Sequence, residues 1–479
     1  MNITKIGLRI LMAIMIMAGG VVTGRAGEQA RPEAGTTERV SVASDGTEGN
    51  AESSYSDISA DGRYVTFESY ASNLVTGDTN NYCEYDGDDD YDENCADVFI
   101  HDRQTGETTR VSVASGGTQG NEGSYDPTLS ADGRYVAFSS MATNLVADDT
   151  NGKTDIFVHD RESGVTTLVS VDNYGWQANG WSGWARISAD GQSVAFASSA
   201  TNLHPGDVNY RDDIFVRDLV NEVTSMVSVS SSGSDGQDTS SNPSISDDGR
   251  YVAFDSWSTN LVDGDTNEFI DIFVHDRESG ETTRVSVASD GTQGDADSSE
   301  PDISGDGQSV AFYSQATNLV IGDVNGFEDV FVHDRSSGET TLVSRASDGT
   351  PGNYGSSSTS ISGDGRYVAF KSWADNLVVG DTNGYDDIFL HDRTSGETIQ
   401  VSIATDGTQS DDYSWSPSLS AGGLIVAFES FATNLVAGDT NLCDNDHDGE
   451  YDDPCEDVFV HEVGVEAAVI LVTLPLVVK

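Results

Sequence analysis

The stretch PDISGDGQSVAFYSQATNLVIGDVNGFEDVFVHDRSSGETTLVSRASDG, residues 301–349, decides the fold of this 479-residue chain. It contains four short runs rich in Val, Ile, Phe and Thr, each closed by Gly, Asp or Ser, which is the pattern of β-strands separated by turns. Helical periodicity is absent from the stretch. It therefore predicts a unit of four strands, at 301–304, 309–314, 329–335 and 339–346.

The same unit recurs along the whole chain. Its turn DGRY, or a variant of it, begins at Asp61, Asp132, Asp190, Asp248, Asp306, Asp364 and, in degenerate form, Gly422. The steps between these turns are 71 residues once and 58 residues five times. One four-stranded unit cannot bury both of its faces, but several units arranged around an axis can. We therefore expect an all-β fold, a seven-bladed β-propeller of four-stranded antiparallel blades.

The two ends of the repeat region predict how the ring closes. A copy of the fourth strand at 38–44 precedes any first strand, whereas the last unit, which ends near His461, has no fourth strand of its own. Segment 38–44 should therefore pair with strand 456–462 and remove an open sheet edge. The expected domains are a signal peptide at 1–26, a linker at 27–37, the propeller at 38–462 and an apolar tail at 463–479.

The N-terminal residues and the overall charge predict where the protein works. Lys5 and Arg9 precede an apolar run at 10–22 that is followed by small residues, which is the pattern of a secretory signal. We expect a secreted, periplasmic or cell-surface protein, in a compartment where disulfides persist. The 12-residue apolar stretch of the tail is too short for a transmembrane span. A formal net charge of -58 argues against nucleic acid and anionic membranes as partners.

Two acid-rich loops of equal length contain all four cysteines. CEYDGDDDYDENC runs from Cys83 to Cys95, and CDNDHDGEYDDPC runs from Cys443 to Cys455. We expect these two pairs to form disulfides, although ring closure makes the loops neighbours and leaves a pairing between them open. The second loop's DNDHDG resembles the start of the calcium loops of EF-hands and thrombospondin type-3 repeats, but no flanking helices are expected.

Calcium is the expected cofactor of these two loops. Alternate carboxylates, with a Gly that allows a sharp turn, supply the roughly six to eight hard oxygens that Ca²⁺ prefers. A solvated acidic loop held by a disulfide is the alternative. The expected ligands, the fourth of each loop through its carbonyl, are Asp444, Asp446, Asp448, Glu450 and Asp452, and Glu84, Asp86, Asp88, Asp90 and Asp92.

A second acidic pattern occurs in the blades. An Asp-x-Asn precedes the third strand and an Asp begins it, as at Asp207, Asn209 and Asp213. The variant DVNGFEDVFV is similar to the calcium loop of integrin-type FG-GAP repeats. With only three side chains per site, hydrogen bonding within Asx-turns is the simpler interpretation.

The histidines do not indicate catalysis. Six of the eight occupy one repeated position in the motif HDR, and a residue copied six times serves the blade rather than a reaction. The other two, His204 and His447, lie near no nucleophile motif, and GxSxG is absent. No catalytic residue is assigned. The six repeated positions are His101, His159, His275, His333, His391 and His461.

Recognition is expected on the face that carries the long loops. Connections after the second and fourth strands of each unit are long, whereas those after the first and third are tight turns. Aromatic side chains on the long-loop face can stack on sugar rings or anchor a protein partner. Packing within the propeller is the alternative, and it is the preferred interpretation for Trp184. The candidate ligand-contacting residues are Trp176, Trp181, Trp257, Trp373 and Trp415.

The repeat resembles that of the TolB-like β-propellers, through SxDGRYVAF, ATNLV, GDxNG, DIFVHDR and SGETT across residues 38–462. The family includes periplasmic scaffolds that bind proteins and propellers attached to hydrolase domains, so the resemblance informs architecture more than activity. The leading interpretation is a secreted, non-enzymatic propeller that binds a protein or glycan. The alternatives are an extracellular carbohydrate-active enzyme, a glycoside hydrolase or lyase using carboxylates on that face, and an envelope or matrix structural protein.

Overall fold

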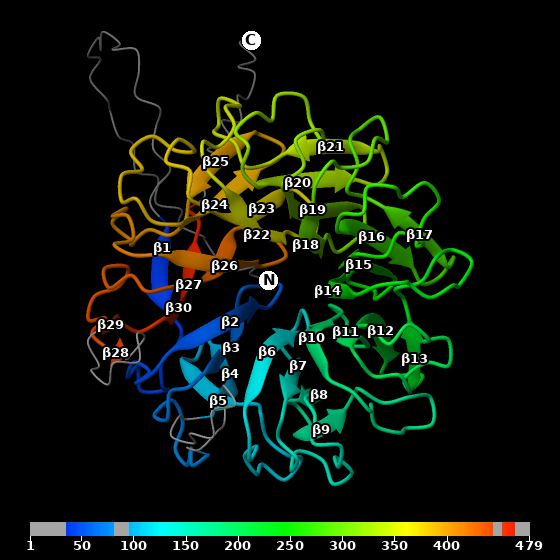
Figure 1. Ribbon diagram of the computed structural model, residues 1–479. Coiled ribbons are helices and arrows are strands. Elements are labelled where there is room, and N and C mark those ends of the chain that lie inside the picture. The colour runs from blue at the N-terminus through cyan, green and yellow to red at the C-terminus, as the bar shows by residue number, and fades with distance from the viewer. Residues whose placement is uncertain (1–34, 81–94, 444–452, 465–479) are drawn as a thin grey trace, which may run out of the picture. The chain divides into compact units, whose positions relative to one another are not determined.

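The computed structural model describes residues 35–80, 95–443 and 453–464, and the regular elements in this part of the chain are all β-strands (Figure 1). They form seven four-stranded antiparallel sheets and one two-stranded hairpin, β28 (Leu442–Cys443) with β29 (Asp453–Pro454). The expected seven-bladed β-propeller is confirmed. The expected signal peptide and the expected tail from residue 465 onward lie outside the described residues and stay predictions. No described helix has the length and hydropathy of a membrane span.

The blades are numbered 1 to 7, and each blade contributes one strand to each of four concentric layers. The innermost strands are β2 (Ser53–Ile58), β6 (Ser124–Leu129), β10 (Ser182–Ile187), β14 (Ser240–Ile245), β18 (Ser298–Ile303), β22 (Ser356–Ile361) and β26 (Ser414–Leu419). The second strands are β3 (Tyr64–Ser69), β7 (Tyr135–Ser140), β11 (Ser193–Ser198), β15 (Tyr251–Ser256), β19 (Ser309–Ser314), β23 (Tyr367–Ser372) and β27 (Ile425–Ser430). The third strands are β4 (Asp97–Asp102), β8 (Asp155–Asp160), β12 (Asp213–Asp218), β16 (Asp271–Asp276), β20 (Asp329–Asp334), β24 (Asp387–Asp392) and β30 (Asp457–Glu462). The outer strands are β5 (Glu107–Arg110), β9 (Val165–Leu168), β13 (Val223–Met226), β17 (Glu281–Arg284), β21 (Glu339–Leu342), β25 (Glu397–Gln400) and β1 (Thr36–Arg39).

The N-terminal strand closes the ring, as expected. Strand β1 pairs antiparallel with β30, the third strand of blade 7, with Thr37 opposite His461. The paired strand is 36–39 rather than 38–44. Beyond Arg39 only the Val40 N–H continues the ladder, to Val458, because the Ser41 hydroxyl turns to donate to the buried Asp457 carboxylate at 2.5 Å.

A second ring of contacts closes the propeller near its axis. The turns between the first and second strands hydrogen-bond from blade to blade through their backbones, and the last turn returns to the first. The seven donor–acceptor pairs are Ala60–Ala131, Ala131–Ala189, Asp190–Asp247, Asp247–Gly305, Gly305–Gly363, Gly363–Ala421 and Ala421–Ala60. In Figure 1 the innermost strands accordingly surround a common centre.

The core lies within and between the blades. Each blade stacks a second-strand Phe on a third-strand Phe, as Phe67 stacks on Phe99 with ring centroids 6.0 Å apart. Apolar side chains of adjacent blades then pack together, so that Val65 of blade 1 belongs to one cluster with Val458 and Val460 of blade 7. Burying one such large side chain contributes about 1.5–3 kcal/mol. Every blade is therefore stabilised by its neighbours.

Candidate functional site

Exposed aromatic side chains gather on one side of the propeller. Among the described residues, every exposed aromatic residue lies in a long connection or on an innermost strand. None of these aromatic residues lies in the tight turns of the opposite face. On the opposite face the exposed large side chains are aliphatic, such as Val220 in a tight turn and Val223 at the start of β13. The exposed aromatics are Tyr55, Tyr174, Trp176, Trp184, Tyr210, Trp257, Phe269, Phe327, Tyr354, Trp373 and Tyr413.

Three of the five expected tryptophans are well exposed. Trp176 lies in the connection between blades 2 and 3 and is 71% exposed. Trp257 and Trp373 are 47% and 56% exposed, and each directly follows the second strand of its blade, 4 and 6. Met141 occupies the same position in blade 2 and is also exposed. Large apolar side chains thus project from three alternate blades.

The other two expected tryptophans are engaged by neighbouring aromatics. Trp181 is half-buried and meets Trp184 edge to face, with ring centroids 5.1 Å apart. Trp415 is half-buried against Phe431, with centroids 4.9 Å apart. Their surfaces are therefore less available to a partner than those of the exposed three.

The innermost strands share an unusual backbone feature that faces the axis. Each has a β-bulge where pairing to the second strand slips, and one non-glycine residue at the bulge has a φ between 45° and 53°. Such a conformation is costly for a non-glycine residue and is kept only where the surroundings enforce it. The residue type changes from blade to blade: Tyr55, Asp126, Trp184, Asn242, Glu300, Ser358 and Ser416.

The second strand carries another variable position beside each bulge. This variation contrasts with the nearly invariant Val-Ala-Phe that precedes it, so the differences between blades are concentrated around the axis. The residues at this position are Glu68, Ser139, Ala197, Asp255, Tyr313, Lys371 and Glu429.

The three carboxylates at this position hold the neighbouring blade. Glu68 accepts the Asp126 N–H at 2.8 Å, and Asp255 accepts the Glu300 N–H at 3.2 Å. In the same way Glu429 accepts the N–H of Ser56 at 3.1 Å. Each acid therefore satisfies a backbone donor at the strained bulge of the next blade.

Burial raises the pKa of two of these acids, Glu68 and Glu429, and that of the neighbouring Glu456. Burial and the charge of Asp126 raise the pKa of Glu68 to about 8. Burial raises the pKa of Glu429 to about 7, and burial with the charge of Glu429 raises the pKa of Glu456 well above its usual range. Although two close carboxyl groups of this kind can act in acid–base catalysis, Glu429 and Glu456 are 2% and 8% exposed. Their position favours a structural role.

The repeated histidines have the structural role expected of them. In each case His Nδ1 lies 2.8–2.9 Å from a Thr Oγ1 of the adjacent outer strand, as for His391 and Thr398. Burial lowers the pKa of His391 and His461 to about 4, so these rings are neutral at physiological pH. In blade 3 Arg217 replaces the histidine and bonds Thr224 instead.

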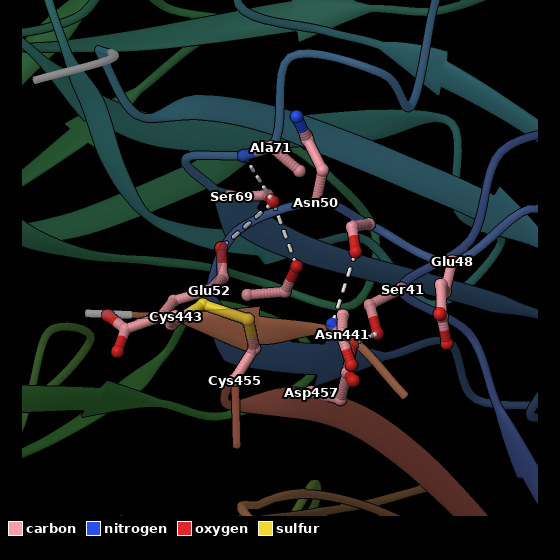
Figure 2. Close-up of a disulfide and its surroundings, with 12 residues drawn as sticks. Ser41, Glu48, Asn50, Glu52, Ser69, Ala71, Asn441, Cys443, Cys455 and Asp457 are labelled. Carbon is pink, nitrogen blue, oxygen red and sulfur yellow. Dashed lines mark hydrogen bonds between the residues drawn. A yellow bond between two sulfur atoms is a disulfide. The ribbon is translucent and has the colours of Figure 1, made fainter. Parts of the chain in front are cut away.

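The second cysteine loop is anchored at the seam where the ring closes. The structure contains the Cys443–Cys455 disulfide, so the pairing between loops that the sequence left open does not involve these two cysteines (Figure 2). Beside it, the Asn441 amide donates to the Gly49 carbonyl at 3.1 Å, which joins blade 7 to the chain entering blade 1. Cys95 is also disulfide-bonded, and Cys83 lies outside the described residues. So do the ten expected calcium ligands at 84–92 and 444–452.

One group of acids in the described residues has the arrangement of a metal site. Asp207, Asp213 and Asp235, all in blade 3 or its following connection, each offer a carboxylate oxygen within 4.8 Å of the other two. The first two belong to the expected Asp-x-Asn pattern, and the third was not singled out from the sequence. A blade-by-blade alignment would have revealed it, because Gln stands at that position in most other blades.

Known proteins resemble this chain only in fold. No family model and no curated protein matches the chain. TolB from Acinetobacter baumannii is 15% identical, with 64% of this chain and 59% of that one covered and a TM-score of 0.37. An oligogalacturonate lyase in complex with manganese is 12% identical over 91% and 94% of the two chains, with a TM-score of 0.49. The β-propeller domain of the Trilobed protease from Pyrococcus furiosus is 12% identical over 79% and 91%, with a TM-score of 0.47. The propeller fold itself is shown by the seven four-stranded sheets.

Proposed function

We propose that the protein is a secreted, non-enzymatic binding module whose long-loop face recognises a protein or a glycan. The observation that carries this proposal is the one-sided distribution of exposed aromatic side chains among the described residues. A Trp side chain exposed to water does not stabilise the fold, whereas Trp and Tyr dominate the binding energy of many interfaces. The side that carries them is therefore the recognition surface.

The charge of the chain narrows the kind of partner. The chain has 81 acidic and 23 basic residues, so a partner approaches a strongly negative surface. Complementary charge speeds encounter and excludes acidic competitors. We expect either a basic protein surface or a glycan without acidic groups, which aromatic rings can stack against.

Calcium in the two cysteine loops is part of the proposal. Bound Ca²⁺ neutralises carboxylates that otherwise repel one another, and it stiffens loops at the closure seam. The Cys443–Cys455 disulfide and the Asn441–Gly49 hydrogen bond fix the base of one loop, which supports a preformed site.

The test is binding of the full chain to arrayed glycans and to arrayed basic and acidic peptides, with Ca²⁺ and with EDTA. The variant Trp257→Ala/Trp373→Ala removes the two apolar anchors of alternate blades and should weaken binding by roughly 30-fold or more, as loss of interface hot spots does. The matched control is Val220→Ala/Val223→Ala on the opposite face, which should bind like the unaltered protein. Absence of binding to every array, or equal binding by both variants, would reject the proposal.

A further inference from the structure

A pair of neighbouring aspartates recurs beneath the long loops. The first residue of the third strand is a buried Asp in every blade, and the Asp of the preceding Asp-x-Asn lies beside it. Blade 1 shows the arrangement: Arg110 lies 3.3 Å from Asp78 and 3.0 Å from Asp97, so one guanidinium serves both carboxylates. Buried like charges need such a partner, because each otherwise raises the cost of ionising the other.

Blades 4 and 7 use the same solution as blade 1. The last residue of the outer strand is again an arginine, Arg284 or Arg39. Arg284 lies 3.1 Å from both Asp265 and Asp271. Arg39 lies 2.9 Å from Asp439 and 3.1 Å from Asp457.

Blade 2 uses a neutral donor instead. Leu168 replaces the arginine, and the side-chain amide of Gln177, in the following connection, donates to Asp149 at 2.7 Å and to Asp155 at 2.8 Å. In blades 1, 2, 4 and 7 the compensating group therefore comes from one of two positions: the end of the outer strand, or the residue equivalent to Gln177.

Blade 3 has neither the cation nor the amide. Met226 ends its outer strand, and Asp235 stands where blade 2 has Gln177. At that position blades 1, 2, 4 and 6 have Gln, and blade 7 has a carboxylate, Glu48, that pairs with Arg39; blade 3 therefore adds a third carboxylate without an arginine beside it. This third carboxylate lies with those of Asp207 and Asp213 in one group whose ligand atoms are within 4.8 Å of one another.

The buried Asp207 is left without compensation. Its side chain is 8% exposed, and neither of its carboxylate oxygens accepts a hydrogen bond from any described residue. The other two acids receive neutral donors: Ser228 to Asp213 at 2.6 Å, and the Val208 N–H to Asp235 at 2.9 Å. Burial and the charge of Asp235 raise the pKa of Asp207 to about 6.

We propose that Asp207, Asp213 and Asp235 bind one divalent cation through their carboxylate oxygens, and that the cation takes the place of the arginine found in blades 1, 4 and 7. The group contains oxygen donors only, which suits Ca²⁺, Mg²⁺ or Mn²⁺ rather than softer metals. Ca²⁺ is the expected ion because it tolerates irregular geometry and abundant carboxylates. The site ties the two long connections of blade 3 to the start of β12, and it is distinct from the cysteine loops of blades 1 and 7.

The test compares Ca²⁺ binding by the full chain and by Asp235→Gln after EDTA treatment, using calorimetric titration and thermal unfolding. Gln is native to the equivalent position in blades 1, 2, 4 and 6, so the variant should fold. It should bind one Ca²⁺ fewer and lose part of the Ca²⁺-induced rise in Tm, while its Tm in EDTA should exceed that of the unaltered chain. Titrations with MgCl₂ and MnCl₂ rank the three ions.

Two further variants make the result decisive. Met226→Arg supplies the cation of blade 1 and should also remove one Ca²⁺, whereas Gln177→Asp places a third carboxylate in blade 2 and should add one. Equal stoichiometry in the unaltered chain and Asp235→Gln would overturn the proposal. A Tm gain for Asp235→Gln that is the same with and without Ca²⁺ would do so too, because it would show only relief of repulsion.

Discussion

At the scale of single residues, comparing the repeats distinguishes two kinds of side chain: those found in most blades, which stabilise the fold, and those that vary between blades. His391 and its equivalents meet a threonine in six blades, so they are part of the blade itself. Glu429 and Asp235 stand at positions whose residue varies between blades, and each changes the local balance of charge. Departures from the repeat are therefore where individual chemistry is found.

The first prediction concerns Glu429 and pH. Burial raises its pKa from 4.5 to about 7 in the folded protein, so the folded state holds a proton that the unfolded chain releases. Its contribution to stability is therefore complete below about pH 4.5 and is lost as the pH rises through about 7. Glu429→Gln mimics the protonated acid and keeps the acceptor for the Ser56 N–H. At pH 8 its free energy of unfolding, measured with urea, should exceed that of the unaltered chain by on the order of 1–3 kcal/mol. At pH 4.5 the two values should differ little.

The control for this prediction is Glu278→Gln. Glu278 is exposed and pairs with Arg250 at 2.6 Å on the surface, so its replacement should change stability by less than about 1 kcal/mol at either pH value. A pH-independent effect of Glu429→Gln would contradict the assignment of a raised pKa.

The second prediction concerns contacts between blades at the tight turns. Gly133 has a φ of 67°, and a Cβ there would lie 2.4 Å from the Tyr64 ring of blade 1. Gly164 has a φ of 69°, but a Cβ there would meet no described atom within 4 Å. Gly164→Ala should cost about 1–2 kcal/mol for the left-handed backbone alone. Gly133→Ala should cost about 1–3 kcal/mol more, because the extra methyl is forced against a neighbouring blade. Urea unfolding measures both, and equal losses would show that the turn does not pack tightly.

At the scale of elements, the strands could be predicted because their cause is local. Each 58-residue unit contains the signals that define its strands. These signals are the alternation of apolar residues, the Val, Ile and Phe of the second and third strands, and the Gly at the turns. The closing strand begins two residues earlier and ends five residues earlier than predicted, because VSVAS carries apolar alternation beyond the outer strand. The Ser41–Asp457 hydrogen bond, between residues 416 positions apart, ends the pairing there.

The axis and the blade 3 site could not be predicted in the same way. The bulge residues look like ordinary strand residues in the sequence, and their left-handed backbone depends on the register with the second strand. The role of Glu68 depends on the Asp126 N–H of the next blade, 58 residues away. Likewise Asp235 lies near Asp207 only because two long connections converge on one strand.

The third prediction concerns ring closure by β1. A chain starting at residue 41 lacks β1 and with it Arg39, which lies 3.1 Å from the buried Asp457. Removing one partner of a buried ion pair costs about 3–5 kcal/mol, and the uncovered edge of β30 can pair with another chain. This chain should melt at lower temperature and associate, as light scattering with size-exclusion chromatography would show. A chain starting at residue 35 keeps β1 and is the control; identical melting and mass for the two would mean that β1 does not close the ring.

At the scale of the whole molecule, the propeller is a scaffold whose negative charge is balanced only locally. Buried arginines such as Arg39 and Arg110 neutralise aspartates inside the blades, yet the formal net charge stays at -58. The uncompensated charge lies mainly on turns and loops, where self-repulsion opposes the compact state. Salt should therefore stabilise this protein as a whole.

The fourth prediction tests that inference with charges that can be removed without altering the fold. In the connections between blades, four exposed aspartates accept the backbone N–H of a threonine two residues later, at 2.9–3.0 Å, and asparagine can accept the same bond. In EDTA, the Tm of the unaltered chain should rise between about 0.01 M and 1 M NaCl, as the Debye length falls from about 30 Å to about 3 Å. KCl should give the same rise, because screening depends on ionic strength.

The fourfold variant Asp45→Asn, Asp290→Asn, Asp348→Asn and Asp406→Asn should start at a higher Tm in low salt and gain less from added salt. If its Tm gained as much as that of the unaltered chain, surface repulsion would not be what limits stability, and the buried acids at the axis would have to account for it.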